Sequence, residues 1–150
     1  MLLSKSCVYG LRASLYLASR AEQEYTSIRE ISEDLEISFH FLTKILQQLT
    51  ADSLMESYKG PNGGIRLSEK GKKATLRDVV IAIDGPGLFT ECALGLPGCG
   101  SSAPCPLHDS WLSVRESIEE MLERTDLKQL AREGRANKFR ITADGSFTWQ

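Results

Sequence analysis

Apolar side chains recur at helical spacing over residues 4–21, and this pattern predicts a first helix. Two shorter helices follow. Ser27 and Glu30 match a capping box, in which each side chain satisfies an unpaired backbone N–H group, so the second helix begins there. Ser38 is a suitable N-cap for a third helix that runs to about Ala51. Two short helices joined by a tight turn form the helix-turn-helix pattern.

Two extended segments, residues 54–59 and 65–68, flank a turn of Gly, Pro and Asn at residues 60–64. This arrangement predicts a β-hairpin. A helix-turn-helix followed at once by a hairpin is the order of a winged helix, which we expect over residues 1–74.

A linking segment and a long amphipathic helix come next. Residues 75–89 form the link and contain a fourth helix that Thr75 and Asp78 cap and Gly85 ends. Over residues 109–131, apolar side chains recur at alternating steps of three and four, and charged side chains such as Arg115 fill the other face. We expect this helix to pair with its copy in a two-fold dimer rather than pack on the first helix of its own chain. The contact residues would be Trp111, Val114, Ile118, Met121 and Leu122.

The last segment, residues 132–150, is a tail in which Asp144-Gly145 favours a short hairpin, with a mobile tail as the alternative. The expected fold class is therefore mainly α with a small β-hairpin, a winged helix-turn-helix plus a long C-terminal dimerisation helix.

Residues 90–108 join the link to the long helix and hold three of the four cysteines. Cys92, Cys99, Cys105 and His108 follow the spacing C-x6-C-x5-C-x2-H, with mostly Gly, Pro, Ser, Ala and Leu between them. Thiolates and imidazole suit zinc or an iron–sulfur cluster. Structural zinc sites usually have shorter gaps between cysteines, so this wide loop modestly favours a cluster. Free cysteines in a mobile loop are the remaining alternative.

Composition narrows the setting. The net charge of -2 does not argue for or against nucleic acid, but residues 57–73 form a local basic patch of Lys59, Arg66, Lys70, Lys72 and Lys73. No apolar run is long enough to span a bilayer, and the first residues lack a signal sequence. We therefore expect a cytoplasmic protein without a membrane partner, where clustered cysteines bind metal or do redox work more often than they form disulfides. No nucleotide-binding or nucleophile–base motif is present, which argues against an enzyme.

In a winged helix the third helix enters the major groove of double-stranded DNA. Its outer face carries His40, Thr43 and Gln47, which can bond base edges, and Ser38 and Lys44, which suit phosphates. Phe39 lies on the same face, and the wing would add Lys59, Gly60, Pro61, Asn62, Gly63 and Gly64. A two-fold dimer predicts a pseudo-palindromic operator.

Over residues 1–131 the chain resembles the Rrf-two family of winged-helix regulators, of the IscR, NsrR and CymR type. The resemblance rests on Tyr9-Gly10-Leu11-Arg12, Ile37-Ser38-Phe39-His40-Phe41-Leu42, the wing, the link helix and the three spaced cysteines. It implies a homodimeric transcription regulator and, in the cysteine-bearing subtype, an iron–sulfur cluster that senses iron, redox state or nitric oxide. The expected cofactor is a [2Fe–2S] rather than a [4Fe–4S] cluster, with zinc as the alternative.

The resemblance also bears on the fourth ligand. His108 follows Cys105 at the spacing of the iron–sulfur assembly regulators, whereas Val8 stands where the nitric-oxide-sensing members have an acidic ligand. Cys7 and Glu91 are the other candidates. We expect the cluster to switch operator affinity. The rival functions are a zinc-stabilised winged-helix DNA-binding protein and, less favoured, an iron–sulfur electron-transfer protein.

Overall fold

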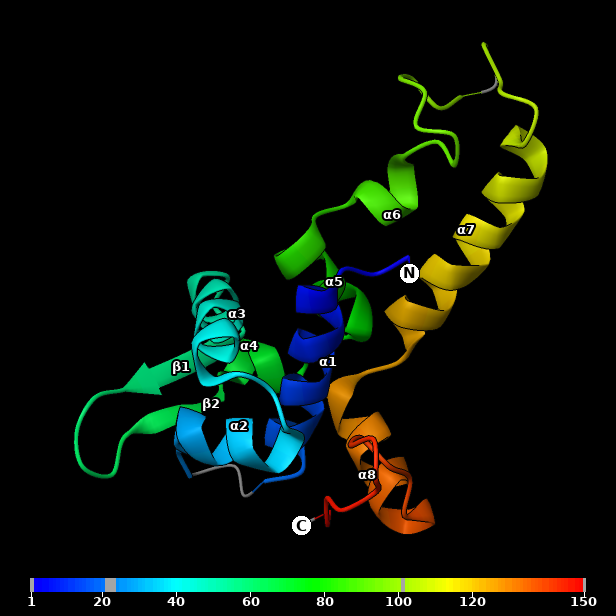
Figure 1. Cartoon of the computed structure of the whole chain (residues 1–150). Coiled ribbons are helices and arrows are strands. Elements are labelled where there is room, and N and C mark those ends of the chain that lie inside the picture. The colour runs from blue at the N-terminus through cyan, green and yellow to red at the C-terminus, as the bar shows by residue number, and fades with distance from the viewer. Residues whose placement is uncertain (1, 21–23, 101, 150) are drawn as a thin grey trace.

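The computed structural model describes residues 2–20, 24–100 and 102–149. The chain is mainly helical with one two-stranded antiparallel hairpin, as expected (Figure 1). The elements are α1 (Lys5–Ala18), α2 (Ile28–Leu35), α3 (Phe39–Ala51), β1 (Met55–Tyr58), β2 (Gly64–Leu67), α4 (Glu69–Lys72), α5 (Leu76–Asp84), α6 (Gly87–Thr90), α7 (His108–Arg124) and α8 (Leu127–Asn137).

Helix α1 runs through the middle of the molecule and packs against α2, α3, α5 and α8 (Figure 1). It ends at Ala18, and the predicted end at Ala21 lies outside the described residues. Apolar side chains from all three helices of the helix-turn-helix meet in the main core, among them Tyr16, Ile31 and Leu46. Burial of these side chains, each almost inaccessible to water, provides the main stabilisation of the module.

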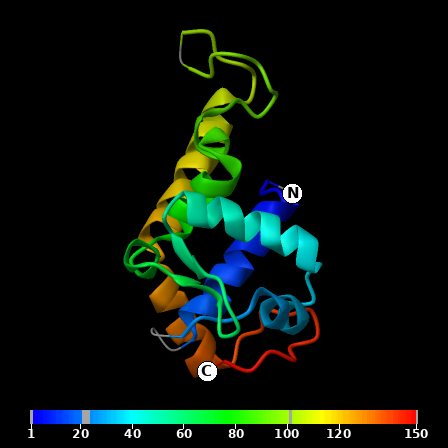
Figure 2. The same ribbon diagram turned by 90° about the vertical axis from the view of Figure 1, so that its left-hand side faces the viewer.

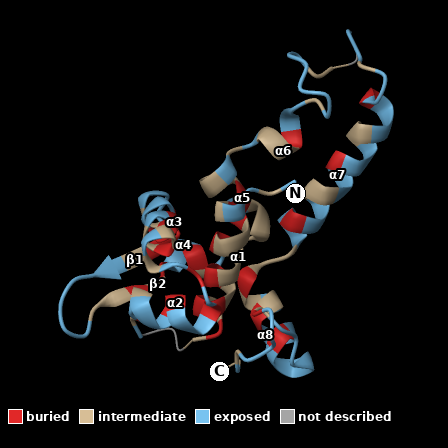
Figure 3. Cartoon of the chain, viewed as in Figure 1, coloured by how far each residue is buried: buried red, intermediate tan, exposed pale blue. Residues whose placement is uncertain are grey.

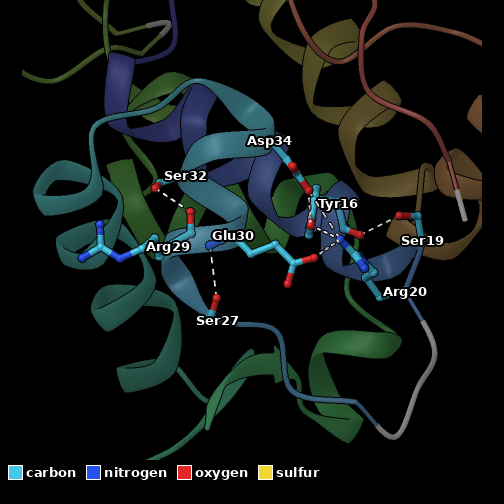
Figure 4. A network of polar contacts seen from close by, with 8 residues as sticks. All are labelled: Tyr16, Ser19, Arg20, Ser27, Arg29, Glu30, Ser32 and Asp34. Carbon is cyan, nitrogen blue, oxygen red and sulfur yellow. Dashed lines mark hydrogen bonds and ion pairs between the residues drawn. The ribbon is translucent and has the colours of Figure 1, made fainter. Parts of the chain in front are cut away.

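Polar contacts fix α2 against the end of α1 (Figure 4). The Tyr16 hydroxyl donates to Asp34 at 2.7 Å, and Arg20 contacts Tyr16 and forms an ion pair with Glu30 at 3.0 Å. At the start of α2, the Ser27 hydroxyl accepts from the Glu30 N–H at 3.1 Å, which confirms Ser27 as the N-cap. The second half of the predicted capping box does not form, because the Glu30 carboxylate pairs with Arg20 instead. These bonds orient the helix that precedes the turn into α3.

The hairpin forms the predicted wing. Met55 pairs with Leu67 and Tyr58 with Gly64, so the turn occupies residues 59–63. Gly64 comes so close to the neighbouring backbone that a Cβ atom there would lie 2.2 Å from the Thr26 carbonyl oxygen. Only glycine fits at this crossing.

The link helix α5 begins with the capping box predicted for Thr75 and Asp78. It packs against α7, and both helices contribute to a second apolar cluster with Cys7, Val80, Phe89 and Leu122. Figure 3 shows that buried positions on α5, α6 and α7 face one another, while the loop above them is largely exposed. Leu122, a predicted dimer contact, is buried in this cluster.

The predicted helix over residues 109–131 is divided in two. The chain is extended at Thr125, where the Thr125 carbonyl accepts from Leu76 N–H at 2.9 Å, and Leu127 N–H donates to the Ala74 carbonyl at 3.1 Å. Asp126 then caps α8 through Gln129 N–H at 2.7 Å. These bonds replace the hydrogen bonds that a continuous helix would make.

The tail differs from the predicted hairpin. Asp144-Gly145 forms a turn, with Gly145 N–H donating to the Thr142 carbonyl at 3.3 Å, but no strand occurs within residues 139–149. The segment packs on the helix-turn-helix, where Phe147 lies 5.1 Å from the Tyr16 ring and the Ile141 carbonyl accepts from Arg12 at 2.7 Å. In the described part of the chain, no helix combines the length and apolar content that crossing a bilayer requires.

Candidate metal centre and nucleic-acid interface

The cysteine loop connects α6 to α7 and projects beyond the ends of both helices. Figures 1 and 2 show it from two sides, at the opposite end of the molecule from α8. Gly95 and Gly98 each have φ of +71°, a conformation that favours glycine and lets the chain curl. The Gly95 N–H donates to the Cys92 carbonyl at 3.0 Å and closes the first turn of the loop.

The four predicted ligands lie in this loop as two pairs. The sulfur atoms of Cys92 and Cys105 are 3.5 Å apart, and the Cys99 sulfur is 3.7 Å from His108 Nδ1. Two sulfurs on one tetrahedral metal ion are separated by about 3.8 Å, and a sulfur and a nitrogen by about 3.5 Å, given bonds of about 2.3 Å to sulfur and about 2.0 Å to nitrogen. Each pair therefore has the spacing of two ligands on one metal ion.

Within the described ranges, no group of three or more Cys, His, Asp or Glu side chains converges on a single point. The donor chemistry nevertheless fits an iron–sulfur centre, because three thiols and an imidazole nitrogen are the residue types that ligate such centres. His108 is the first residue of α7, and it is buried. Its backbone N–H donates to the Cys105 carbonyl at 3.0 Å, so the start of the helix holds these two ligands together.

Backbone amides act on the first cysteine. N–H groups of Leu96 and Leu94 point at the Cys92 sulfur, the second at 3.4 Å, and lower the pKa of this thiol below its ordinary value. Desolvation raises the pKa of Cys105 instead. The turn thus favours the anionic form of Cys92, which is the form that binds metal.

Arg115 and Trp111 fasten the loop to α7. Both side chains donate to the Glu91 carbonyl, at 3.1 Å and 2.9 Å, and Arg115 also donates to the Cys99 sulfur at 3.4 Å. Arg115, assigned to the solvent-facing side by its charge, is therefore buried. It lies seven residues after His108, on the same helix face, and that spacing was the signal in the sequence.

The two other candidate ligands lie elsewhere. Cys7 is fully buried on α1 beside Val80 and Leu122, where burial and the nearby Asp84 carboxylate raise its pKa to about 12. The Glu91 carboxylate faces Gly87, so only its backbone carbonyl takes part in the loop contacts.

The predicted DNA-contacting face of α3 is accessible. Ser38, His40, Lys44 and Gln47 are exposed, and Phe39 and Thr43 are half-buried. The Thr43 hydroxyl donates to the Phe39 carbonyl at 2.8 Å. On α2, Arg29 lies 4.8 Å from the Phe39 ring centre, and its exposed guanidinium adds a cation to this face that the sequence pattern does not reveal.

A groove between α3 and the hairpin brings two parts of this face together, since Thr43, Gln47 and Lys59 all line it. The tip residues Lys59, Gly60, Pro61 and Asn62 are exposed, and Gly63 and Gly64 are half-buried. Three other cations of the basic patch are engaged within the chain: Arg66 with Glu56 at 3.1 Å, Lys72 with Glu69 at 2.8 Å, and Lys70 with the Asp52 carbonyl at 3.1 Å.

Comparison with known proteins decides the family. The profile of the Rrf2 family, described as iron-dependent transcriptional regulators, matches residues 3–133. The chain belongs to the Rrf2 family. A Mycobacterium tuberculosis protein named as a candidate HTH-type transcriptional regulator is 33% identical over 132 residues, which cover 87% of this chain and 81% of that protein.

Solved Rrf2 folds superpose closely. T. potens IscR matches with a TM-score of 0.73 at 20% identity, covering 91% of this chain and 90% of its own. CymR, titled the global cysteine regulator of B. subtilis, matches with a TM-score of 0.72 at 24% identity, covering 87% and 96%. The Rrf2 family consists of DNA-binding transcriptional regulators, typically dimeric, and not of enzymes.

An apolar groove of this Rrf2 chain runs between α7 and the start of α1. It is lined by Leu2, Leu3, Val8, Leu88, Ile118, Met121 and Leu122. Of the predicted dimer contacts, Val114 and Met121 are exposed, Ile118 is half-buried in the groove, and half-buried Trp111 points its indole N–H at the loop.

Proposed function

We propose that the chain is a homodimeric transcription regulator whose operator affinity is controlled by an iron–sulfur centre in the α6–α7 loop. The observation that carries this proposal is the pairing of Cys92 with Cys105 and of Cys99 with His108 between α6 and the start of α7. Each pair has the spacing of two ligands on one metal ion, so the two pairs together suit a centre with two iron atoms. This supports a [2Fe–2S] centre over a [4Fe–4S] centre or a single zinc ion.

When bound, such a centre supplies a redox-active group whose presence depends on iron and which oxidants or nitric oxide can destroy. The residues of the chain connect that group to the rest of the molecule. Cys105 and His108 join the centre to the first turn of α7, while Trp111 and Arg115 hold Glu91, next to Cys92, against the same helix. A change in the loop is therefore transmitted to α7.

The second half of α7 lines the apolar groove, which we propose as the contact with a second copy. Regulators of this family are typically dimeric. Met121 is exposed in the groove, and Val114 is exposed two turns earlier on α7. Exposed apolar side chains that continue a groove are typical of a protein–protein contact. Movement of α7 would then change the separation of the two α3 helices and hence the fit to a pseudo-palindromic operator.

On DNA, we assign His40, Thr43 and Gln47 to base edges in the major groove, with Phe39 alongside them. Ser38, Lys44 and the wing residues 59–64 contact phosphates or the minor groove. Arg29 supplies a further phosphate contact at the same edge.

The experiment is anaerobic purification followed by iron, sulfide and zinc analysis and a visible spectrum. We expect a brown protein with equal iron and sulfide, and loss of colour in Cys92→Ala, Cys99→Ala and Cys105→Ala. His108→Ala should change the spectrum, while Cys7→Ala is the matched control that keeps it. A colourless protein containing zinc would identify the rival zinc-stabilised regulator, and colour that does not affect DNA binding would favour an electron-transfer protein.

A further inference from the structure

Arg115 is a buried cation at the centre of the loop contacts. Its side chain projects from α7, only 8% of the residue is exposed, and the guanidinium Nη1 atom reaches both the Glu91 carbonyl and the Cys99 sulfur. Among residues 2–20, 24–100 and 102–149, no carboxylate lies within 4.0 Å of this guanidinium.

The other arginines near α7 differ. Arg77 is paired with Glu119 at 3.0 Å, and Arg124, which is well exposed, with Glu120 at 3.3 Å. Burying a cation without an anion is strongly unfavourable, so a buried arginine indicates negative charge within reach. The side chain that contacts Arg115 and can carry negative charge as a thiolate is Cys99. Its sulfur is also paired with the His108 ring.

We propose that Arg115 is a positioning residue that supplies the counter-charge for an anionic centre held through Cys99, an inference that rests on the proposed iron–sulfur function. The guanidinium fixes the Cys99 branch of the loop on α7 by its hydrogen bond. Its positive charge would stabilise the reduced centre, which carries one more electron, relative to the oxidised centre. Arg115 would therefore raise the reduction potential of the iron–sulfur centre.

Trp111 allows the charge to be separated from the packing. Its indole N–H donates to the same Glu91 carbonyl at 2.9 Å but carries no charge. Trp111→Phe removes the hydrogen bond to the Glu91 carbonyl and leaves the net charge around the loop unchanged. Arg115→Met removes the charge, Arg115→Lys retains it, and Arg124→Met removes an exposed charge from the same helix.

The test is an anaerobic titration of the purified proteins, in which a chemical reductant delivers one electron to the centre and the visible spectrum reports the ratio of the two forms. For Arg115→Met we expect the reduced-to-oxidised ratio at a fixed potential to fall at least tenfold, equivalent to a shift of about 59 mV to lower potential. Arg115→Lys should recover most of the change, Arg124→Met should match the wild type, and Trp111→Phe should shift the potential far less than Arg115→Met.

Iron and sulfide analysis of the same samples separates the possible failures. A wild-type protein without iron and sulfide contradicts the proposed function itself. Wild-type and Arg115→Met proteins with equal iron and equal potentials overturn the role of Arg115. Loss of iron from Arg115→Met alone supports the counter-charge, whereas equal loss from Arg115→Met, Arg115→Lys and Trp111→Phe contradicts it and assigns the residue to packing.

Discussion

Gly64 shows how a single residue fixes the wing next to α3. It pairs with Tyr58 and crosses the Thr26 backbone, where a Cβ atom would lie 2.2 Å from the Thr26 oxygen. A backbone neighbour cannot move away as a flexible side chain can, so any larger residue displaces the hairpin from the helix-turn-helix. The wing tip would then lose its position beside the recognition helix.

Gly64→Ala should therefore lower the free energy of unfolding by about 2 kcal/mol, within the range for overpacked sites. Gly100→Ala is the matched control, because a Cβ atom there would meet only the Gly98 oxygen at 3.9 Å. Denaturant unfolding followed by circular dichroism measures both variants. Equal stability of the two variants would show that the Thr26–Gly64 crossing is not rigid.

Only some residues of the candidate site can be predicted from the sequence. Cysteine and histidine are common metal ligands, so their type and spacing predict Cys92, Cys99, Cys105 and His108 as ligands. In the structure these residues lie between α6 and the start of α7 as two pairs. Arg115 could not be named in this way, because a charged residue on an amphipathic helix is normally assigned to water. Its burial depends on how the loop folds back over α7.

At the scale of elements, we assign α3 both phosphate contacts and base contacts on DNA. Lys44 and Gln47 are both exposed on it, one turn apart, and Gln47 also lines the groove shared with the wing. The two side chains are suited to different tasks, since an ammonium group binds phosphate on any sequence and an amide can distinguish bases.

We expect Lys44→Ala to weaken binding to all duplexes and to reduce the slope of log affinity against log salt by about 0.9. Gln47→Ala should cost about 1–3 kcal/mol on the preferred operator and relax specificity at one base pair. Fluorescence anisotropy over a salt series measures both effects, with Arg132→Ala on α8 as the charge control. An unchanged salt slope in Lys44→Ala would remove this lysine from the interface.

Elements set by local pattern were predicted well, and elements set by distant contacts were not. Helices α1, α2, α3 and α5 and the hairpin occur where periodicity, caps and turns indicated. The break between α7 and α8 depends on hydrogen bonds of residues 125–127 with residues 74–76, about fifty positions earlier in the chain. Asp126 as an N-cap was the local signal for that break. The one-turn helices α4 and α6 are too short for any periodicity to reveal.

At the scale of the whole molecule, the apolar groove is the proposed contact between two copies of the chain. Met121→Glu places a charge on a side chain that is 50% exposed and lines that groove, so the folded chain should survive while the dimer dissociates. Sedimentation velocity at micromolar concentration should show a monomer. Ser117→Glu, on an exposed position of α7, should leave the dimer intact. A dimeric Met121→Glu protein would place the interface on another surface.

We propose that the contents of the α6–α7 loop control DNA binding by α3 and the wing. The most direct measurement compares the operator affinity of the iron-loaded protein with that of the same protein after removal of iron under anaerobic conditions. The operator is obtained by selecting random duplexes with both forms in parallel. We predict at least a tenfold difference in affinity, absent in the Cys99→Ala variant. Equal affinity of the two wild-type forms would contradict the account.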